Sequence, residues 1–322
     1  MDNIKFCIVG LGVIGNVHAK VLDDMVGKPC AVCDIDEEKL EKFSDVKGYT
    51  DYVTMLTEIK PDVVHICTPH YLHADMIIEA LNRDINVLCE KPLCIKLEDI
   101  DRILEAERRS KAQLGVCHQN RYNKENAFLK EYLQDKKVVS GYGSVVWDRD
   151  KEYYAQADWR GKWATEGGGV LINQALHTLD LMQWLVGMPE NVTASTSNFT
   201  LKDAIEVEDT ASIICSGGGN FSFFATNGSC TSFPVSIMVK TEDELIRVMP
   251  NKILTAKGVQ DFKQDERAYG KCCYGSGHNG LIRDFYDCVK TGRKFEIDGQ
   301  EGSKVIRIIL GAYESNGRKI NI

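Results

Sequence analysis

Three glycines directly after a short apolar run constrain this chain more than any other feature. The run Lys5–Val9 leads into Gly10, Gly12 and Gly15, and a helix-like segment, Asn16–Leu22, follows. In a strand–turn–helix unit such glycines give a tight turn, room for a pyrophosphate and close helix–strand packing. The amino end of the helix then offers N–H groups to phosphate. The spacing predicts a dinucleotide site whose contacts come from Gly10, Gly12, Val13, Ile14 and Gly15.

An acidic residue at the end of the next apolar run indicates which dinucleotide binds. The run Ala31–Cys33 ends at Asp34, close to the spacing of about 20 residues that the fingerprint requires. A carboxylate there accepts hydrogen bonds from ribose hydroxyls and repels a 2′-phosphate, and Ile35 supplies no cation to offset that repulsion. We therefore expect NAD as the cofactor, with NADP the less favoured choice.

Strand-like and helix-like segments alternate through residues 1–121. Helical spacing is clearest in Ala74–Asn82 and in Leu97–Ser110, where Ile100, Ile103 and Leu104 share one face. The apolar runs are Lys5–Val9, Ala31–Cys33, Val63–Cys67, Asn86–Cys89 and Gln113–Cys117. Such alternation predicts an α/β domain with a doubly wound parallel sheet, a Rossmann domain, over residues 1–121.

Residues 122–322 show a different pattern. After a helix-like stretch near 123–134, strand-like segments follow at hairpin-like intervals, with turn signals at 216–220 and at Asn227-Gly228. They are Ser144–Trp147, Val192–Thr200, Thr210–Ser216, Phe221–Thr226, Val235–Val239 and Glu244–Val248. One helix is predicted over 168–185, and two late helices near 281–290 and 302–316 can pack back on the first domain. We expect an α+β domain with a large, open, mostly antiparallel sheet.

Composition narrows the class of partner. The formal net charge of −8 argues against a nucleic-acid binder, which normally presents a basic face. No stretch approaches the roughly 20 apolar residues that span a bilayer, and the start of the chain lacks a signal-peptide pattern. We therefore expect a cytoplasmic protein with no membrane or nucleic-acid partner.

The 12 cysteines do not form a regular framework. Several lie in or beside predicted strands, where a free thiol behaves as a small apolar side chain. Cys30 and Cys33 make a lone Cys-x-x-Cys, and Cys272-Cys273 lies near His278. A zinc site needs about four ligands at compatible spacing, so we expect no disulfides and no metal.

Further motifs resemble one enzyme family. They are Thr68-Pro69-His70-Tyr71-Leu72-His73, Glu90-Lys91-Pro92, Gly167-Gly168-Gly169 with Asn173, His177 and Asp180, and the late Arg283-Asp284-Phe285-Tyr286 and Gly299-Gln300-Glu301-Gly302. Together they resemble the glucose–fructose oxidoreductase and inositol dehydrogenase family, Gfo/Idh/MocA, nearly end to end. The resemblance implies a sugar, polyol or related hydroxyl as substrate and a homo-oligomer, a dimer or tetramer, formed through the second-domain sheet. It also implies cofactor contacts from Thr68, Pro69, His73, Glu90, Lys91 and Asn120.

Lys91 is the first predicted catalytic residue. It follows a strand at the sheet edge where ligands bind, and an ammonium there can stabilise charge that develops on a reacting oxygen. The alternative is a surface lysine in a turn, with no catalytic role. The resemblance implies a cis peptide bond between Lys91 and Pro92, which proline permits.

His177 is the second, because the ordinary pKa of imidazole suits proton exchange near neutral pH. Asn173, His177 and Asp180 are spaced to share one face of the predicted helix. Many family members carry Asp where this chain has Asn173, and an amide cannot take a proton. Asn173 can still hold a substrate hydroxyl. Asp180, also predicted at the substrate site, either orients His177 or, with equal weight, caps the helix or supports the residues that touch the substrate.

Aromatic and basic residues near these motifs complete the candidate site. Tyr122 follows a predicted strand, and Trp159, Arg160 and Trp163 precede the glycine run. The tryptophans can stack on a sugar face, and Arg160 can contact cofactor or substrate; covering a core is the equally weighted alternative for both tryptophans.

The leading functional hypothesis is an NAD-dependent oxidoreductase acting on a hydroxyl or keto carbon of a sugar or polyol. The first alternative is a glycoside-cleaving enzyme that uses NAD for transient oxidation and elimination. The second is a non-catalytic NAD-binding regulator, which needs neither Lys91 nor His177. The sugar, the carbon and the physiological direction do not follow from the sequence.

Overall fold

The computed structural model describes residues 4–263, 269 and 275–322, and these form two compact units. The first unit comprises residues up to Gln119 together with 265–303, and the second comprises 120–264 together with 304–322. The late helix α10 (Gly299–Ser315) belongs to the first unit up to Ser303 and to the second from Lys304. Cys272 and Cys273 lie outside the described residues.

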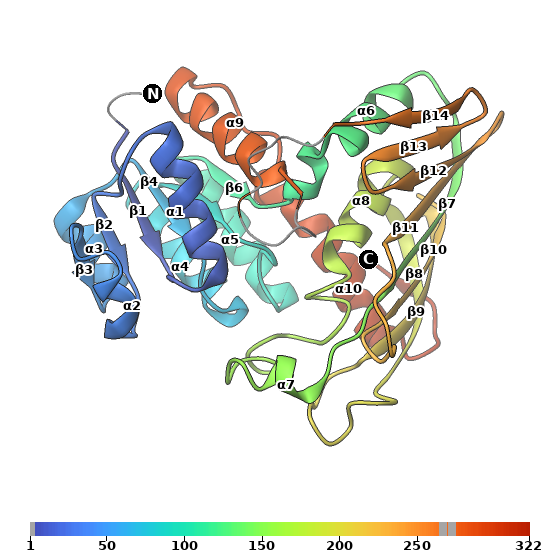
Figure 1. Cartoon of the computed structure of the whole chain (residues 1–322), viewed down its shortest axis with the longest axis horizontal. Coiled ribbons are helices and arrows are strands. Elements are labelled where there is room, and N and C mark those ends of the chain that lie inside the picture. The colour runs from blue at the N-terminus through green and yellow to red at the C-terminus, as the bar shows by residue number, and fades with distance from the viewer. Residues whose placement is uncertain (1–3, 264–268, 270–274) are drawn as a thin grey trace. The chain divides into compact units, whose positions relative to one another are not determined.

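The first unit contains a six-stranded parallel sheet with the order β3-β2-β1-β4-β5-β6 (Figure 1). Its strands are β1 (Phe6–Val9), β2 (Ala31–Cys33), β3 (Lys47–Tyr49), β4 (Val63–Ile66), β5 (Asn86–Cys89) and β6 (Leu114–Val116). Its helices are α1 (Val13–Met25), α2 (Glu37–Glu41), α3 (Tyr52–Ile59), η1 (His70–Leu72), α4 (His73–Leu81), α5 (Leu97–Arg109) and α9 (Gly277–Thr291). This is the predicted Rossmann architecture.

Burial explains why the central strands are continuous apolar runs. Every residue of β1 and β4 is buried, as a parallel sheet with helices on both faces requires. Helix α1 packs beside α9, and α4 packs beside α5. The late helix α9 is therefore part of this unit, and its Phe285 and Tyr286 are fully buried.

The second unit contains a nine-stranded sheet with the order β14-β13-β12-β11-β7-β10-β9-β8-β15. The strands are β7 (Val138–Val146), β8 (Pro189–Ser197), β9 (Thr210–Gly218), β10 (Phe221–Thr226), β11 (Ser236–Thr241), β12 (Leu245–Met249), β13 (Lys252–Thr255), β14 (Gly258–Asp261) and β15 (Ile320–Asn321). The described pairs are antiparallel except β7–β10, which is parallel. The remaining helices are η2 (Gln119–Tyr122), α6 (Lys124–Tyr132), α7 (Lys151–Tyr154) and α8 (Leu176–Val186).

Helix α8 covers one face of this sheet, where it packs on β7, β10 and β11 (Figure 1). Buried and exposed residues alternate along β9 and β10, as they do when one face of an antiparallel sheet packs on a core. Gly141 and Gly143 of β7 make room for the helix, because a Cβ at either position would lie within 3.1 Å of Met182. The opposite face exposes Tyr142, Ile214 and Phe224.

The prediction of one helix over 168–185 was wrong in its first half. Helix α8 begins only at Leu176. Before it, Gly167 and Gly168 have φ of 85° and 147°, and the N–H of Ala175 bonds the carbonyl of Val170, five residues back. Regular α-helical spacing is therefore absent between Asn173 and His177, so only His177 and Asp180 lie in one helix.

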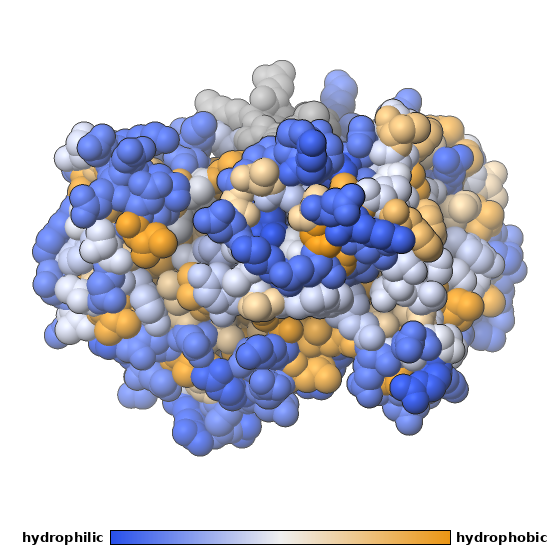
Figure 2. Space-filling view, turned by 90° about the horizontal axis from the view of Figure 1, so that it is seen from below, coloured by the Kyte–Doolittle hydropathy of each residue, from blue (hydrophilic) through white to orange (hydrophobic). Residues whose placement is uncertain are grey.

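Free thiols and a mixed surface complete the description. The ten cysteines described, Cys7 and Cys288 among them, are free. Within the described ranges no helix is long and apolar enough to cross a membrane. The face drawn in Figure 2 shows hydrophobic residues in separate patches among hydrophilic ones.

Candidate active site

The glycine turn of the first unit has the geometry that a pyrophosphate needs. Gly10 has φ of 87°, and a Cβ on Gly15 would lie 1.9 Å from the Gly10 carbonyl oxygen, so neither position accepts a side chain. A Cβ on Gly12, by contrast, would meet nothing within 4 Å. The space beside Gly12, at the amino end of α1, is thus open to a ligand, and Val13 and Ile14 supply the first turn of the helix.

Asp34 is tied to this turn by its own hydrogen bonds. Its Oδ2 accepts the N–H of Leu11 at 2.7 Å, and its Oδ1 accepts the N–H of Asp36 at 3.0 Å. Lys39 reaches Oδ1 at 3.3 Å, a cation that the sequence argument from Ile35 did not anticipate. The carboxylate therefore shapes the glycine turn, and it stands directly after β2, where the sequence predicts a contact with ribose.

The turns after β4 and β5 are joined by a buried histidine. The ring of His73 places Nδ1 2.6 Å from the Pro92 carbonyl oxygen and Nε2 2.9 Å from the Thr68 carbonyl oxygen. The bond between Lys91 and Pro92 is cis, as predicted. Thr68, Pro69 and Lys91 thus lie on turns at the same carboxyl edge as the glycine turn, and His73 holds those turns together.

Glu90 is held by histidines that the sequence analysis did not single out. Its Oε1 lies 3.0 Å from Nε2 of His18 and 3.4 Å from Nε2 of His278, and its Oε2 accepts the N–H of Lys91 at 3.2 Å. Burial would raise the pKa of Glu90, but the hydrogen bonds from His18 and His278 outweigh it and hold the pKa well below its usual value.

A directional chain of hydrogen bonds ends at this carboxylate. The Tyr286 hydroxyl lies 2.9 Å from Nε2 of His65, and Nδ1 of His65 lies 2.8 Å from Nδ1 of His18. Burial lowers the pKa values of both histidines, so the rings are neutral and each carries one N–H. Tyr286 then donates to His65, His65 to His18, and His18 to Glu90, which fixes each tautomer.

In the second unit, Asp180 is bound by an arginine. Nε and Nη2 of Arg121 donate to the two Asp180 oxygens at 2.8 and 2.6 Å, and both side chains are buried. Asn120 and Tyr122 flank Arg121 in η2, and the Asn120 carbonyl accepts the side-chain amide of Asn126 at 2.8 Å. The pair joins η2 to α8, and His177 lies one turn before Asp180 in the same helix.

The loop before α8 carries the remaining candidates. Arg160 lies over the rings of Trp159 and Tyr153, 4.6 and 4.8 Å from their centroids. Trp163 is 45% exposed, and its indole N–H donates to the Glu206 carbonyl at 3.1 Å. Asn173 donates from Nδ2 to the buried carboxylate of Glu166.

A second buried carboxylate shapes the glycine run. Glu208 accepts the N–H groups of Gly169 and Leu171 at 2.8 and 3.0 Å and the hydroxyl of Tyr313 at 3.0 Å. Burial raises the pKa of Glu208 to about 7. Both Glu166 and Glu208 escaped the sequence analysis; the only signal for Glu166 was its position directly before Gly167.

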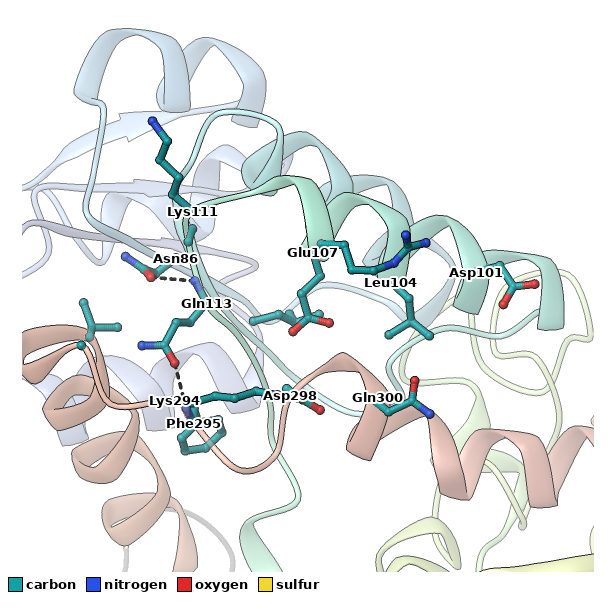
Figure 3. Close-up of a pocket in the computed structure, with 15 residues that line it drawn as sticks. Asn86, Asp101, Leu104, Glu107, Lys111, Gln113, Lys294, Phe295, Asp298 and Gln300 are labelled. Atoms are coloured by element: carbon teal, nitrogen blue, oxygen red, sulfur yellow. Dashed lines mark hydrogen bonds and ion pairs between the residues drawn. The ribbon is translucent and has the colours of Figure 1, made fainter.

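A polar groove of about 870 Å³ lies elsewhere in the first unit, between α5 and the segment 289–300 (Figure 3). Asn86 and Gln113 stand at the amino ends of β5 and β6, so the groove lies at the sheet edge opposite the glycine turn. It does not belong to the candidate active site.

Comparison with known proteins identifies the class. Residues 4–118 match a family model described as "Oxidoreductase family, NAD-binding Rossmann fold", and residues 137–243 match "GFO/IDH/MocA C-terminal domain". The chain belongs to the Gfo/Idh/MocA family of oxidoreductases, and its first unit contains that family's NAD-binding domain.

Individual relatives are moderately similar. The inositol 2-dehydrogenase of Salmonella paratyphi B is 29% identical over 191 residues, 57% of this chain and 54% of the relative. The chain spans about half the length of the curated relatives it matches first. The structure of the WlbA dehydrogenase from Bordetella pertussis with NADH and UDP-GlcNAcA has a TM-score of 0.86 at 27% identity, covering 99% of each chain. Levoglucosan dehydrogenase, with a TM-score of 0.85 at 19% identity and complete coverage, shares the fold.

Proposed function

We propose that the protein is an NAD-dependent oxidoreductase acting on a CH–OH group of a sugar, polyol or sugar derivative. The observation that carries the proposal is the carboxyl edge of the first sheet. There the open glycine turn, Asp34 and Lys91 lie on neighbouring turns. Open parallel sheets bind nucleotides at that edge. The relatives support the substrate class, because their names include inositol, levoglucosan and UDP-GlcNAcA.

The chain's own residues have distinct roles in this proposal. When bound, NAD accepts the hydrogen and electron pair of the carbon that carries the hydroxyl. Lys91 hydrogen-bonds the reacting oxygen and stabilises its developing negative charge. His177 takes the hydroxyl proton as general base and returns it in the reverse direction. Glu90 positions Lys91 through its bond to the Lys91 backbone N–H.

Substrate and cofactor contacts complete the proposal. Asn173, Tyr122, Trp159 and Trp163 bind the substrate, and Asp180 supports them through Arg121. Gly10, Gly12, Val13, Ile14, Gly15, Asp34, Thr68, Pro69, His73, Glu90, Lys91, Asn120 and Arg160 serve the cofactor. We propose the first unit as cofactor domain and the second as substrate and oligomerisation domain. The free thiols of the described cysteines are typical of a reducing compartment and support a cytoplasmic location.

A substrate panel tests the activity. The protein is incubated with NAD or NADP and with inositols, free sugars, anhydrosugars and UDP-linked sugars, and NADH is followed by absorbance. We expect NADH to accumulate with at least one compound, and NADPH to accumulate more slowly when NADP replaces NAD. Release of an aglycone without NADH would instead support the glycoside-cleaving alternative. NADH binding with no turnover of any compound would support the regulator.

Two variants test the catalytic roles. We expect Lys91→Met and His177→Ala to lower kcat about 10²–10⁴-fold, the usual contribution of a positioned acid–base group, while NADH still binds. Lys96→Met, an exposed lysine five residues on, serves as the control and should keep its activity. Near-normal turnover in either active-site variant would contradict its assignment.

A further inference from the structure

The buried carboxylate of Glu166 stands in the loop before the glycine run. It is fully buried, with the Gly161 N–H bonded to Oε2, the Asn173 amide bonded to Oε1, and Nη1 of Arg160 4.0 Å from Oε1. Two N–H donors and a guanidinium thus face its two oxygens. Each oxygen therefore already accepts an N–H bond, and the nearby guanidinium favours the carboxylate form, which only accepts hydrogen bonds.

An acceptor-only neighbour decides which way the Asn173 amide turns. The oxygen and nitrogen of an amide have nearly the same shape, so only hydrogen-bond partners distinguish the two orientations. Facing Glu166, the amide must present Nδ2, and Oδ1 then takes the other direction. Asn173 is partly exposed to solvent, whereas Glu166 is fully buried.

The loop around this pair is braced by further polar contacts. Arg160 donates to the Tyr153 hydroxyl at 2.9 Å, and Gln174 donates to the same hydroxyl at 3.0 Å. Asn227 in turn donates to Gln174 at 3.0 Å. Glu166 therefore acts on Asn173 from a fixed position, and a carboxylate at 173 would face it charge against charge.

We propose that Glu166 is a positioning residue that orients the Asn173 amide so that Oδ1 accepts a hydrogen bond from a substrate hydroxyl. This inference rests on the proposed function for the identity of the substrate. The orientation itself depends only on the contact between the two side chains. Asn173 thereby provides the acceptor that a carboxylate would provide, without a second buried charge.

A set of four variants tests the contact without any substrate. Asn173→Asp places two carboxyls together, so they share a proton and the folded state binds protons more tightly than the unfolded state. We expect its stability relative to wild type to fall as pH rises from 5 to 8 in urea unfolding. Adding Glu166→Gln should abolish that fall, because the new amide at position 166 donates to the carboxylate introduced at position 173. Glu166→Gln alone and the exposed Glu206→Gln should show no such slope. The titratable groups near Glu166 include Arg160, Tyr154, Tyr313 and Glu208, which accepts the Tyr313 hydroxyl, and all four are unchanged throughout.

Kinetics with an active compound from the panel tests the positioning role. We expect Glu166→Gln to raise KM roughly tenfold with a smaller change in kcat, since the amide can now turn and one substrate hydrogen bond is weakened. Asn173→Asp should lose most activity at pH 8, and the double variant should recover at the same pH to within about tenfold of wild type.

The unfolding experiment and the kinetic experiment test different parts of the proposal, and each can contradict its part independently. If no panel compound turns over, the proposed function fails, while the unfolding slopes still decide the Glu166–Asn173 contact. Parallel slopes for Asn173→Asp and wild type would overturn the contact. An unchanged KM in Glu166→Gln, or no rescue by the double variant, would overturn the positioning role even with the contact intact.

Discussion

At the scale of single residues, buried and half-buried carboxyl groups divide into two kinds. Glu90 receives a neutral histidine N–H and stays charged, whereas burial raises the pKa of Glu107 in α5 to about 7. Glu107 borders the polar groove (Figure 3). It accepts the Gly299 N–H at 3.3 Å. One hydrogen bond at that distance does not offset the loss of water, so the charged form of Glu107 destabilises the folded state.

Glu107 therefore predicts a pH dependence with a definite sign. Its folded pKa of about 7 lies above the ordinary value of 4.5, so its stabilising effect is complete below pH 4.5 and is lost as pH rises through 7. We expect Glu107→Gln to remove this loss, which amounts to as much as about 3 kcal/mol by pH 8. Urea unfolding at pH 5, 6, 7 and 8 measures it, with Glu105→Gln on the same helix as control. Curves of wild type and Glu107→Gln that stay parallel across this range would contradict the assignment.

The contacts of single residues also explain which of them could be predicted from the sequence and which could not. Gly10, Asp34 and Lys91 each closely follow a short strand, so local spacing was enough to propose them as site residues. His65 and Tyr286 are 221 positions apart and meet only because α9 packs in the first unit. Glu166 and Glu208 depend on a loop whose path is set by glycines with positive φ and by carboxylate–amide bonds, which helical periodicity does not encode.

At the scale of elements, packing against β6 depends on one glycine. A Cβ on Gly115 would lie 2.8 Å from two ring carbons of Phe285 and 2.9 Å from Cδ1 of Leu88. The ring of Phe285 in turn meets Phe295 edge-on, with centroids 5.2 Å apart. The aromatic side chains have no space to retreat, so the absence of a side chain at 115 is what lets α9 approach the sheet.

We accordingly expect Gly115→Ala to destabilise the protein by about 1–3 kcal/mol, the usual cost of overpacking a core. Phe285→Leu should partly compensate in the double variant, because a smaller side chain vacates the space. Chemical denaturation of the four proteins in a double-mutant cycle measures the coupling. Additive effects would show that the Gly115–Phe285 contact is not the cause.

Periodicity found most elements because burial follows it. The strands β1, β2, β4, β5 and β6 and the helices α4 and α5 were predicted nearly in full. The short strands β3, β13, β14 and β15 were missed, since two to four residues at or next to a sheet edge, with mostly exposed or half-exposed side chains, carry little pattern. The start of α8 was wrong for the related reason that an apolar segment can follow an irregular turn and still be buried.

At the scale of the whole molecule, the uncovered face of the nine-stranded sheet supports the proposed homo-oligomer. Tyr142 pairs with Met238 and Ser222 across the sheet, and Ser222 pairs with Ile214, so the exposed side chains form a continuous row. Ile214 is 61% exposed and Tyr142 47%. Apolar side chains gathered on one face mark an interaction surface more often than scattered ones do.

We expect the protein to form a dimer or tetramer in solution and Ile214→Glu to shift it toward monomer. A charge buried in an apolar interface loses its water without gaining a partner. Light scattering after gel filtration measures the mass, and Leu97→Glu, an exposed leucine of α5 in the first unit, is the control. A wild-type monomer, or an unchanged oligomer in Ile214→Glu, would contradict the proposed interface.

Helix α9 contributes Phe285 and Tyr286 to the core of the first unit, although more than 150 residues separate the helix from β6. On the ribosome, then, the first unit cannot finish folding until α9 has been translated, long after its last strand, β6. In a fragment that ends after β6, Phe6 and His65 would lose their contact with the ring of Tyr286. A minimal nucleotide-binding fragment of this protein must therefore join the segment up to Gln119 to the segment 265–303.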